Sequence, residues 1–356
     1  MSAAQEIDGV LAAVGRAVPG KGVYALPWYL VVGAPGSGRT TALKSMQLAW
    51  PNGDAPLNLG VPQQGTTYWL AQEAAIIEPE LGVFGANVGA EPLRALCDAL
   101  HQKRPREPVD GILLFMSLVD FVDLDDRGLE AYASGLRAWL VEIGRRLHAD
   151  VPVYIAVTRY DSLWGFAEVF QWGPERRREE PWGFLLPGDT PSQQATGRIQ
   201  QELEGLGARI ESFCLGKLGS DDPPEFRTRG FQHMAEARAA LGKLSTILAA
   251  LTTPNRFDRA PWVRALVIGS ALPGLGDRPR VSVARFANMG LTPAQAGSGV
   301  QRPGGLPIHA FLKTVVLPER ELVPLRVRWR DDLLTMIPLI LAGVVALVTI
   351  VLAIVL

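Results

Sequence analysis

Residues 33–40 read G-A-P-G-S-G-R-T, which is the pattern of a phosphate-binding loop except for an arginine at the lysine position. The apolar residues 28–32 before them predict a buried strand, and residues 41–48 predict a helix. This strand–loop–helix context is needed because the glycines let backbone N–H groups approach a phosphate at a helix N-terminus. The residues that we expect to contact a nucleotide in this segment are Gly33, Gly36, Gly38, Arg39, Thr40 and Thr41.

Arg39 is the departure with the greatest chemical consequence. A lysine ammonium makes a compact contact with phosphate, whereas a guanidinium is planar and bulkier. Arg39 therefore keeps the positive charge without reproducing the contact. Thr40 occupies the position whose hydroxyl would hold Mg²⁺. The loop thus predicts a nucleotide-binding fold and argues against rapid hydrolysis.

A second nucleotide-binding element follows the apolar run 151–157. GTPases carry the pattern [NT]-K-x-D at the end of a later strand, where the aspartate accepts hydrogen bonds from the edge of guanine. Residues 158–161 read T-R-Y-D, so Thr158 and Asp161 are retained and the lysine is again an arginine. An aspartate at a strand end can also simply cap the next helix. Its order after a phosphate loop favours contact with a base.

An acidic residue that holds a metal ion and positions water is expected after the apolar run 74–77. Glu78 occupies that place, in E-P-E-L rather than the usual D-x-x-G. Its side chain is longer than that of aspartate, and Pro79 restricts the turn that would sense a γ-phosphate. Thr66 is a candidate Mg²⁺ ligand together with Thr40 and Glu78, or else part of a plain turn. We assign no catalytic residue, and these departures argue against a fast NTPase.

Strand-like and helix-like segments alternate along the chain, which predicts an α/β fold with a P-loop GTPase-like, doubly wound, mostly parallel sheet. Two helices beyond residue 190 carry apolar stripes, which we interpret as core or helix-pair packing rather than as a groove for a partner. The stripes comprise Ile199, Leu203, Leu206, Ile210 and Phe213, and Phe231, Met234, Leu241, Leu244, Leu248 and Leu251. The further predicted elements are strands at 112–116 and 263–269, helices at 92–101, 129–147 and 308–317, and an extended segment at 272–306. We divide the chain into an N-terminal extension (1–26), a degenerate P-loop NTPase-like domain (27–172), a helical extension (173–260), a strand with a Gly/Pro-rich juxtamembrane region (261–332) and a transmembrane helix (333–356).

Residues 333–356 contain no charged residue and are rich in Leu, Ile, Val and Ala. A helix of this length exceeds the roughly 30 Å of hydrocarbon in a bilayer. The arginines before it are Arg320, Arg326, Arg328 and Arg330. The positive-inside tendency therefore predicts a single-pass membrane protein with residues 1–332 in the cytoplasm. The alternative is a buried core helix or a lipid-free helix of an oligomer. Residues 1–26 lack the pattern of a signal peptide.

Composition excludes several other classes of protein. The formal net charge is −1, which gives no electrostatic footprint for nucleic acid. Cys97 and Cys214 stand far apart, so the sequence supports neither a disulfide framework nor a zinc site. The four histidines are scattered without the spacing of metal ligands.

In combination, several motifs resemble the IcmF/TssM family of type VI secretion membrane-complex proteins. They are P-W-Y-L-V-V-G-A-P-G-S-G-R-T-T-A-L (27–43), G-T-T-Y-W-L-A-Q-E-A-A-I-I-E (65–78), V-D-G-I-L-L-F-M-S-L-V-D (109–120), V-P-V-Y-I-A-V-T-R-Y-D (151–161), G-F-A-E-V-F (165–170), P-W-G-F (181–184) and F-L-K-T-V-V-L-P-E-R-E-L (311–322). The resemblance covers nearly the whole chain. It implies that Gly33, Gly38, Arg39, Thr40, Thr158 and Asp161 occupy nucleotide positions and Glu78 the metal-side position. Both signature lysines and the family's D-T-A-G turn are absent here.

The resemblance implies an inner-membrane component of a cell-envelope complex, in contact with baseplate and other membrane subunits, and we expect an oligomer. Two functions remain open. The favoured one is a membrane-anchored scaffold that uses a degenerate nucleotide fold as a docking surface and needs no cofactor. The other is a nucleotide switch or slow GTPase or ATPase that binds GTP or ATP with Mg²⁺. A more remote alternative is a tail-anchored GTPase in membrane targeting, similar to a signal-recognition receptor subunit, against which the two-helix insertion argues.

Overall fold

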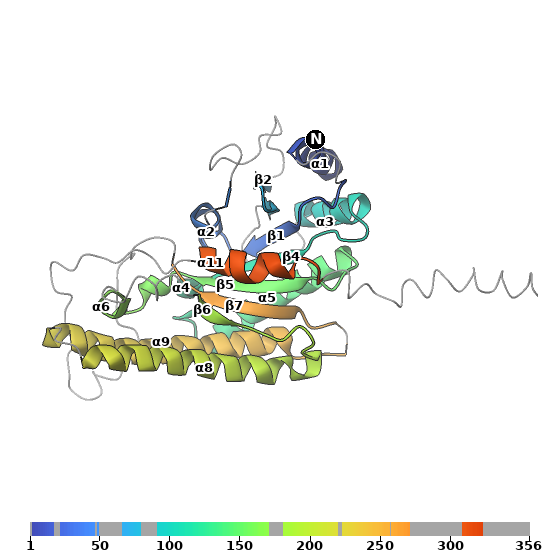
Figure 1. The fold of residues 1–356 in the computed structure, drawn as a ribbon. Helices are drawn as coiled ribbons and strands as arrows, with labels where there is room; N and C mark the ends of the chain where they lie inside the picture. Colours follow the sequence, from blue (N-terminus) through green and yellow to red (C-terminus); the bar gives the residue numbers. More distant parts are fainter. Residues whose placement is uncertain are drawn as a thin grey trace, which may run out of the picture.

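The computed structural model describes residues 2–17, 22–46, 48–49, 66–79, 91–170, 181–219, 223–256, 258–270 and 308–322. Within these residues, seven strands form one sheet with the order β2-β3-β1-β4-β5-β7-β6 (Figure 1). The strands are β1 (Trp28–Gly33), β2 (Thr66–Leu70), β3 (Ala75–Pro79), β4 (Gly111–Ser117), β5 (Pro152–Thr158), β6 (Trp182–Leu185) and β7 (Trp262–Ile268). β3, β1, β4, β5 and β7 pair in parallel, whereas β2 and β6 pair antiparallel with their neighbours at the two edges. The predicted mostly parallel α/β sheet is thus present.

The central strands read as continuous apolar runs because both faces of the sheet are covered. In β1, the side chains of Leu30 and Val32 join the core on one face, and those of Tyr29 and Val31 join the core on the other. The same alternation, required by the two-residue period of a strand, continues through β4 and β5. The two cores therefore lie on opposite sides of one sheet.

Helices α1 (Ala3–Ala17), α3 (Glu91–Lys103), α5 (Asp126–Arg146) and α9 (Pro224–Thr252) contribute to the larger core. Asp125 caps the start of α5, where its side chain accepts a hydrogen bond from the N–H of Gly128. Helix α1 was not predicted from the sequence, and its Ile7, Val10 and Val14 are buried on one helical face. Residues assigned to an N-terminal extension therefore belong to this core.

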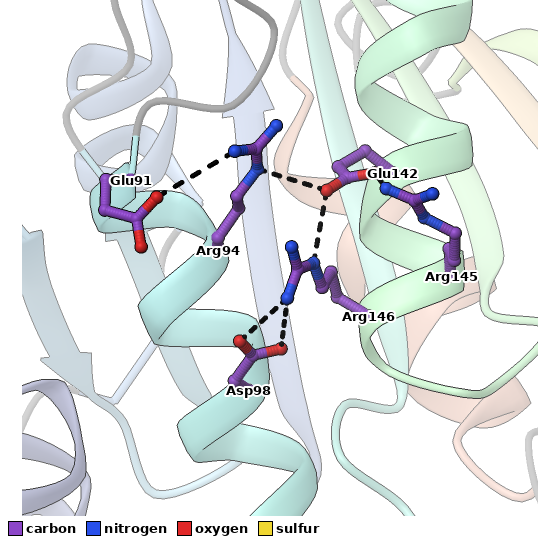
Figure 2. Close-up of polar contacts among 6 residues, drawn as sticks. All are labelled: Glu91, Arg94, Asp98, Glu142, Arg145 and Arg146. Atoms are coloured by element: carbon purple, nitrogen blue, oxygen red, sulfur yellow. Dashed lines mark hydrogen bonds and ion pairs between the residues drawn. The ribbon is translucent and has the colours of Figure 1, made fainter.

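A network of ion pairs joins α3 to α5, and Figure 2 shows it centred on Glu142. Glu142 accepts hydrogen bonds from Arg94 and Arg146, each at 3.2 Å, and from Arg145. Arg146 also contacts Asp98 at 3.0 Å. Burial acts to raise the pKa of Glu142, but the hydrogen bonds from Arg146 and Arg145 outweigh it, so its pKa is lowered. The network holds the two helices side by side at their polar surfaces.

Two long helices, α8 (Ser192–Leu218) and α9, run side by side along the sheet (Figure 1). The apolar stripes predicted for them lie mostly in the larger core, which confirms helix-pair and core packing. Phe231 is an exception, because 56% of its surface is exposed. In the sequence, β6 precedes this helix pair and β7 follows it. Both strands belong to the same sheet as the strands of residues 27–172. The predicted boundaries at 172 and 260 therefore divide a single sheet.

The opposite face is covered by α2 (Arg39–Ser45) and by the segment α11 (His309–Phe311), η2 (Leu312–Val316) and η3 (Leu317–Glu319). Leu43 of α2 and Leu312 and Val316 of this segment belong to one apolar cluster. The Tyr29 hydroxyl donates a hydrogen bond to the carbonyl of Val316 at 3.2 Å. This segment and the helix that follows the phosphate loop therefore contribute to the same apolar cluster on one face of the sheet.

Hydrogen bonds of Glu319 with Tyr154 and Arg264, together called the latch below, hold the end of this segment. The carboxylate of Glu319 accepts hydrogen bonds from Tyr154 Oη at 3.0 Å and from Arg264 Nε at 3.1 Å. The second guanidinium contact, from Nη2, involves the other oxygen of Glu319. Arg264 Nη1 also donates to the carbonyl of Leu186 at 2.6 Å. Because β5 and β7 carry the two donors, the latch fixes the segment to the sheet.

The predicted transmembrane segment 333–356 and the predicted extended segment 272–306 lie outside the described residues. Among the residues that are described, no helix has both the length and the apolar character needed to cross a bilayer. Cys97 and Cys214 are buried free thiols, as expected from their separation in the sequence.

Candidate functional site

The phosphate-like loop lies where the strand order reverses. From β1 the chain builds β2 and β3 on one side, and from β4 it builds β5 and β7 on the other. In open α/β sheets, ligands bind beyond the carboxyl ends of the strands at such a point. The loop 34–38 leaves the carboxyl end of β1 and leads directly into α2. Its position is therefore that of a nucleotide site.

The glycines of the loop are required by its backbone. Gly36 and Gly38 have φ values of 78° and 82°, in the left-handed region that favours glycine. A Cβ atom at Gly33 would lie 2.5 Å from the carbonyl oxygen of Phe115 in β4. The loop then enters α2, whose Ala42 N–H donates to the carbonyl of Gly38 at 2.8 Å. This backbone can serve as a cradle for an anion.

The Arg39 side chain is held by the turn after β3. Its Nη1 donates a hydrogen bond to the carbonyl of Pro79 at 2.9 Å, and its Nε lies 3.8 Å from Glu78 Oε1. Only 11% of the side chain is exposed. Arg39 therefore lies within ion-pair distance of the acidic residue Glu78. The guanidinium thus donates to a carbonyl of the protein at the turn after β3.

Thr40 and Glu78, predicted on the metal side, are in contact. Thr40 Oγ1 donates to Glu78 Oε1 at 2.8 Å, and Trp69 Nε1 donates to Glu78 Oε2 at 2.9 Å. Both carboxylate oxygens thus have protein partners. Thr66 begins β2 and lies opposite Pro79 in the β2–β3 register, which places it in an edge strand rather than in a loop. Arg39, Thr40 and Glu78 together are called the Arg39 cluster below.

The base side of the site is built from β5 and β7. Thr158 Oγ1 donates to the carbonyl of Ser37 at 2.7 Å, which ties the end of β5 to the phosphate loop. Asp161 is buried, and its Oδ1 accepts a hydrogen bond from Ser270 Oγ at 2.6 Å. Ser270 was not among the site residues predicted from the sequence. It follows the strand predicted at 263–269, but the pairing of that strand with β5 could not be read from the sequence.

The turn between Thr158 and Asp161 has an unusual backbone. Arg159 has a φ of 56°, a conformation that is uncommon for a residue other than glycine. It precedes η1 (Tyr160–Ser162). Burial raises the pKa of Asp120, and the nearby charge of Arg159 acts in the opposite direction. Thr41, the last residue predicted to contact a nucleotide, is exposed in the first turn of α2.

The residues present fit a nucleotide in part. The backbone cradle, Thr158 and Asp161 suit a phosphate and a base, and Thr40 with Glu78 are oxygen ligands of the kind that Mg²⁺ prefers. Within the described residues, no group of three or more His, Cys, Asp and Glu side chains could hold a metal ion by itself. The position of Arg39 does not fit the standard role of the loop cation.

Comparison with known proteins identifies the family. Residues 87–343 match the model of the IcmF-related N-terminal domain. The chain belongs to the IcmF-related family. Over 284 residues it is 28% identical to the type VI secretion system component TssM1 of Pseudomonas aeruginosa, an alignment that covers 75% of this chain and 25% of TssM1. The IcmF-related chain thus spans about a quarter of this relative.

Solved structures resemble the IcmF-related chain only distantly. A GTP-binding protein from Sulfolobus solfataricus in complex with GDP is 14% identical over 44% of this chain and 40% of that chain, with a TM-score of 0.23. The signal recognition particle receptor SRb-GTP/SRX complex from Chaetomium thermophilum is 19% identical over 38% and 71%, with a TM-score of 0.24. The cytosolic domain of the FeoB iron transporter of T. maritima, in a GDP form, is 13% identical over 63% and 98%, also with a TM-score of 0.24. These similarities are too distant to assign a ligand.

Proposed function

We propose that the chain is a scaffold subunit of a type VI secretion-like complex, with a cytoplasmic domain anchored to the bacterial inner membrane. The IcmF-related match and the similarity to TssM1 support the secretion assignment. The charge-free segment 333–356 and the arginines before it support the membrane anchor. In this role the α/β domain docks baseplate and other membrane subunits within an oligomeric assembly.

The Arg39 cluster is the observation that carries the scaffold role. Catalysis of phosphoryl transfer depends on cations positioned to neutralise developing charge. The Arg39 guanidinium instead contacts the carbonyl of Pro79 and the carboxylate of Glu78. Thr40 donates to the same carboxylate. A nucleotide would have to displace these contacts, whereas a scaffold benefits from them because they fix the turn after β3 to α2.

The first test is thermal unfolding of the purified chain with GTP or ATP and Mg²⁺. A ligand at 100 times its Kd stabilises the native state by about 2.7 kcal/mol, so binding would raise the Tm measurably. The scaffold role predicts no shift with either nucleotide. It also predicts that Thr40→Ala still co-purifies with the baseplate and membrane subunits. A Tm increase with either nucleotide would contradict a purely structural role.

A second candidate function is a nucleotide-dependent switch that controls assembly. The observation that favours it is the retention of Thr158 and Asp161, where Thr158 contacts Ser37 and Ser270 donates a hydrogen bond to Asp161. This candidate predicts micromolar binding of fluorescent GTP or ATP. Asp161→Asn has nearly the same shape, and it should weaken GTP binding at least tenfold while changing ATP binding little, because a buried hydrogen-bonding group discriminates strongly. Equal affinities of wild type and Asp161→Asn for GTP would argue against base recognition at this turn.

Arg39→Lys serves as the matched control for both candidates. It restores the standard loop cation and shortens the reach to Pro79. If wild type and Arg39→Lys both fail to bind nucleotide, the switch is excluded and the scaffold role stands. If Arg39→Lys binds and wild type does not, the arginine itself has closed the site.

A further inference from the structure

One face of α9 contacts residues 160–168, a segment that begins within the T-R-Y-D motif. Arg229, Gln232 and His233 are three and four residues apart, so their side chains project from the same side of the helix. Each contacts a residue between 160 and 168: His233 contacts Tyr160, Gln232 contacts Trp164, and Arg229 contacts Glu168. The helical extension is therefore joined directly to the base side of the site.

His233 makes the contact nearest to the motif. Its Nδ1 lies 2.8 Å from the carbonyl of Trp164, and its Nε2 lies 3.2 Å from the hydroxyl of Tyr160. Because a carbonyl can only accept, Nδ1 carries the proton and Nε2 accepts from Tyr160. Burial lowers the pKa of His233 to about 4, so the ring is neutral at physiological pH. His233 therefore acts as a neutral side chain that is hydrogen-bonded to Tyr160 and to the carbonyl of Trp164, not as a charged group.

The Tyr160 ring is enclosed as well as hydrogen-bonded. It is 1% exposed and packs edge-on against the rings of His233, Phe166 and Phe170, at centroid distances of 5.7, 6.0 and 6.1 Å. A buried side chain with several such contacts has little freedom to move. The backbone that carries Tyr160 is therefore fixed with respect to α9.

The neighbouring contacts leave little space between α9 and this segment. Trp164 Nε1 donates to Gln232 Oε1 at 2.6 Å, and Arg229 Nη1 pairs with Glu168 Oε1 at 2.5 Å in a buried ion pair. Gly165 has a φ of 78°, and a Cβ atom there would lie 2.3 Å from the carbonyl of Arg229. Glycine at this position allows the two backbones to touch.

These contacts lead to the base-recognition residues through one short stretch of backbone. Tyr160 directly precedes Asp161, and its N–H donates to the carbonyl of Gly269 at 3.2 Å. Gly269 precedes Ser270, which orients Asp161. We infer that His233 is a positioning residue for the turn 158–162, so that the α8–α9 helix pair controls the geometry of base recognition. The effect of His233 on nucleotide affinity, called the ligand arm below, rests on the switch proposed above. The effect of His233 on the turn 158–162 itself, called the structural arm, does not depend on that switch.

The structural arm is tested by hydrogen exchange on the ligand-free full-length chain. His233→Phe keeps an aromatic ring but removes both hydrogen bonds. We expect the amides of Tyr160 and Ser162 to exchange about tenfold faster, while amides of β4 and β5 keep their protection. His233→Gln can place an acceptor near the former Nε2 and should recover part of the protection. Arg238→Ala is the control, because Arg238 lies on the same helix, its side chain is 75% exposed, and it pairs with Glu211 of α8.

The ligand arm compares affinities for fluorescent GTP and ATP. His233→Phe should reduce the GTP/ATP preference of the wild type by about tenfold, which corresponds to about 1.4 kcal/mol, and Arg238→Ala should leave it unchanged. A wild type that binds neither nucleotide refutes the switch, and the inference is then decided by exchange alone. Unchanged exchange at residues 160–162 in His233→Phe, or an equal acceleration throughout the sheet, would overturn the positioning role.

Discussion

Removing the Glu319 carboxylate should release the C-terminal segment without unfolding the sheet. In Glu319→Ala, Arg264 loses its ion-pair partner and Tyr154 loses its acceptor. Breaking a buried ion pair costs about 3–5 kcal/mol. Here Arg264 keeps its bond to the carbonyl of Leu186, and Glu319 is 15% exposed, so we expect about 2–3 kcal/mol.

The loss of stability in Glu319→Ala has an upper bound, because Glu319 holds only the segment that ends beside it. Glu319 lies near the end of a segment that can detach locally, so the variant loses no more than the free energy that docks this segment. A loss of 2–3 kcal/mol corresponds to opening that is about 30- to 150-fold more frequent. Hydrogen exchange of the amides in residues 312–319 measures it, with β4 and β5 as internal references.

Glu321→Ala is the matched control. Glu321 is 87% exposed and lies 4.0 Å from Arg320, so its removal should cost no more than a few tenths of a kcal/mol. Unchanged protection at 312–319 in Glu319→Ala would mean that apolar packing alone holds the segment. A uniform loss of protection through the sheet would mean that the latch supports the whole fold. Either result refutes the reasoning.

Two other predictions concern the loop and a buried carboxylate. Gly33→Ala should destabilise the chain by about 3 kcal/mol in urea unfolding, because its Cβ would lie 2.5 Å from the Phe115 carbonyl. Gly36→Ala, whose Cβ would meet no atom within 4 Å, should cost only the roughly 1–2 kcal/mol of a left-handed backbone, and equal costs would contradict the clash. Burial raises the pKa of Asp110 to about 6, against the opposing effects of the Trp28 N–H and Arg104. Because this folded-state pKa lies above the ordinary value, the contribution of Asp110 to the free energy of unfolding increases as pH falls from about 7 to about 4. The wild type should therefore gain this stability between pH 7 and pH 5, and Asp110→Asn should not, when unfolding is compared at the two pH values.

The sequence was most informative where local chemistry determines the structure. The glycines of the loop need special backbone angles, and the apolar runs of β1, β4 and β5 need burial on both faces, so both could be predicted. The proximity of Thr40 and Glu78 followed from the order of elements in a doubly wound sheet. These predictions rest on properties of short stretches of chain.

Features that depend on distant partners could not be read in the same way. β6 has four residues, W-G-F-L, and its place at the sheet edge is decided by pairing with β7 beyond two long helices. Ser270 becomes relevant only because β7 lies beside β5. Phe231 continues an apolar stripe in the sequence yet is exposed to solvent. Hydrophobic periodicity does not show how far along a helix its neighbouring elements extend to cover it. In each case the missing information is the identity of a spatial neighbour.

The apolar cluster shared by α2 and the segment 308–316 has a consequence for the order in which the protein is made. α2 has seven residues, fewer than the roughly 12–15 that an isolated helix needs to be even marginally stable in water. Its Leu43 packs in the cluster that Leu312 and Val316 complete. During synthesis, the cluster that buries Leu43 of α2 is therefore incomplete until residue 316 has left the ribosome. A ribosome-bound chain that ends before residue 308 should be cut by protease near α2, and a longer one should resist.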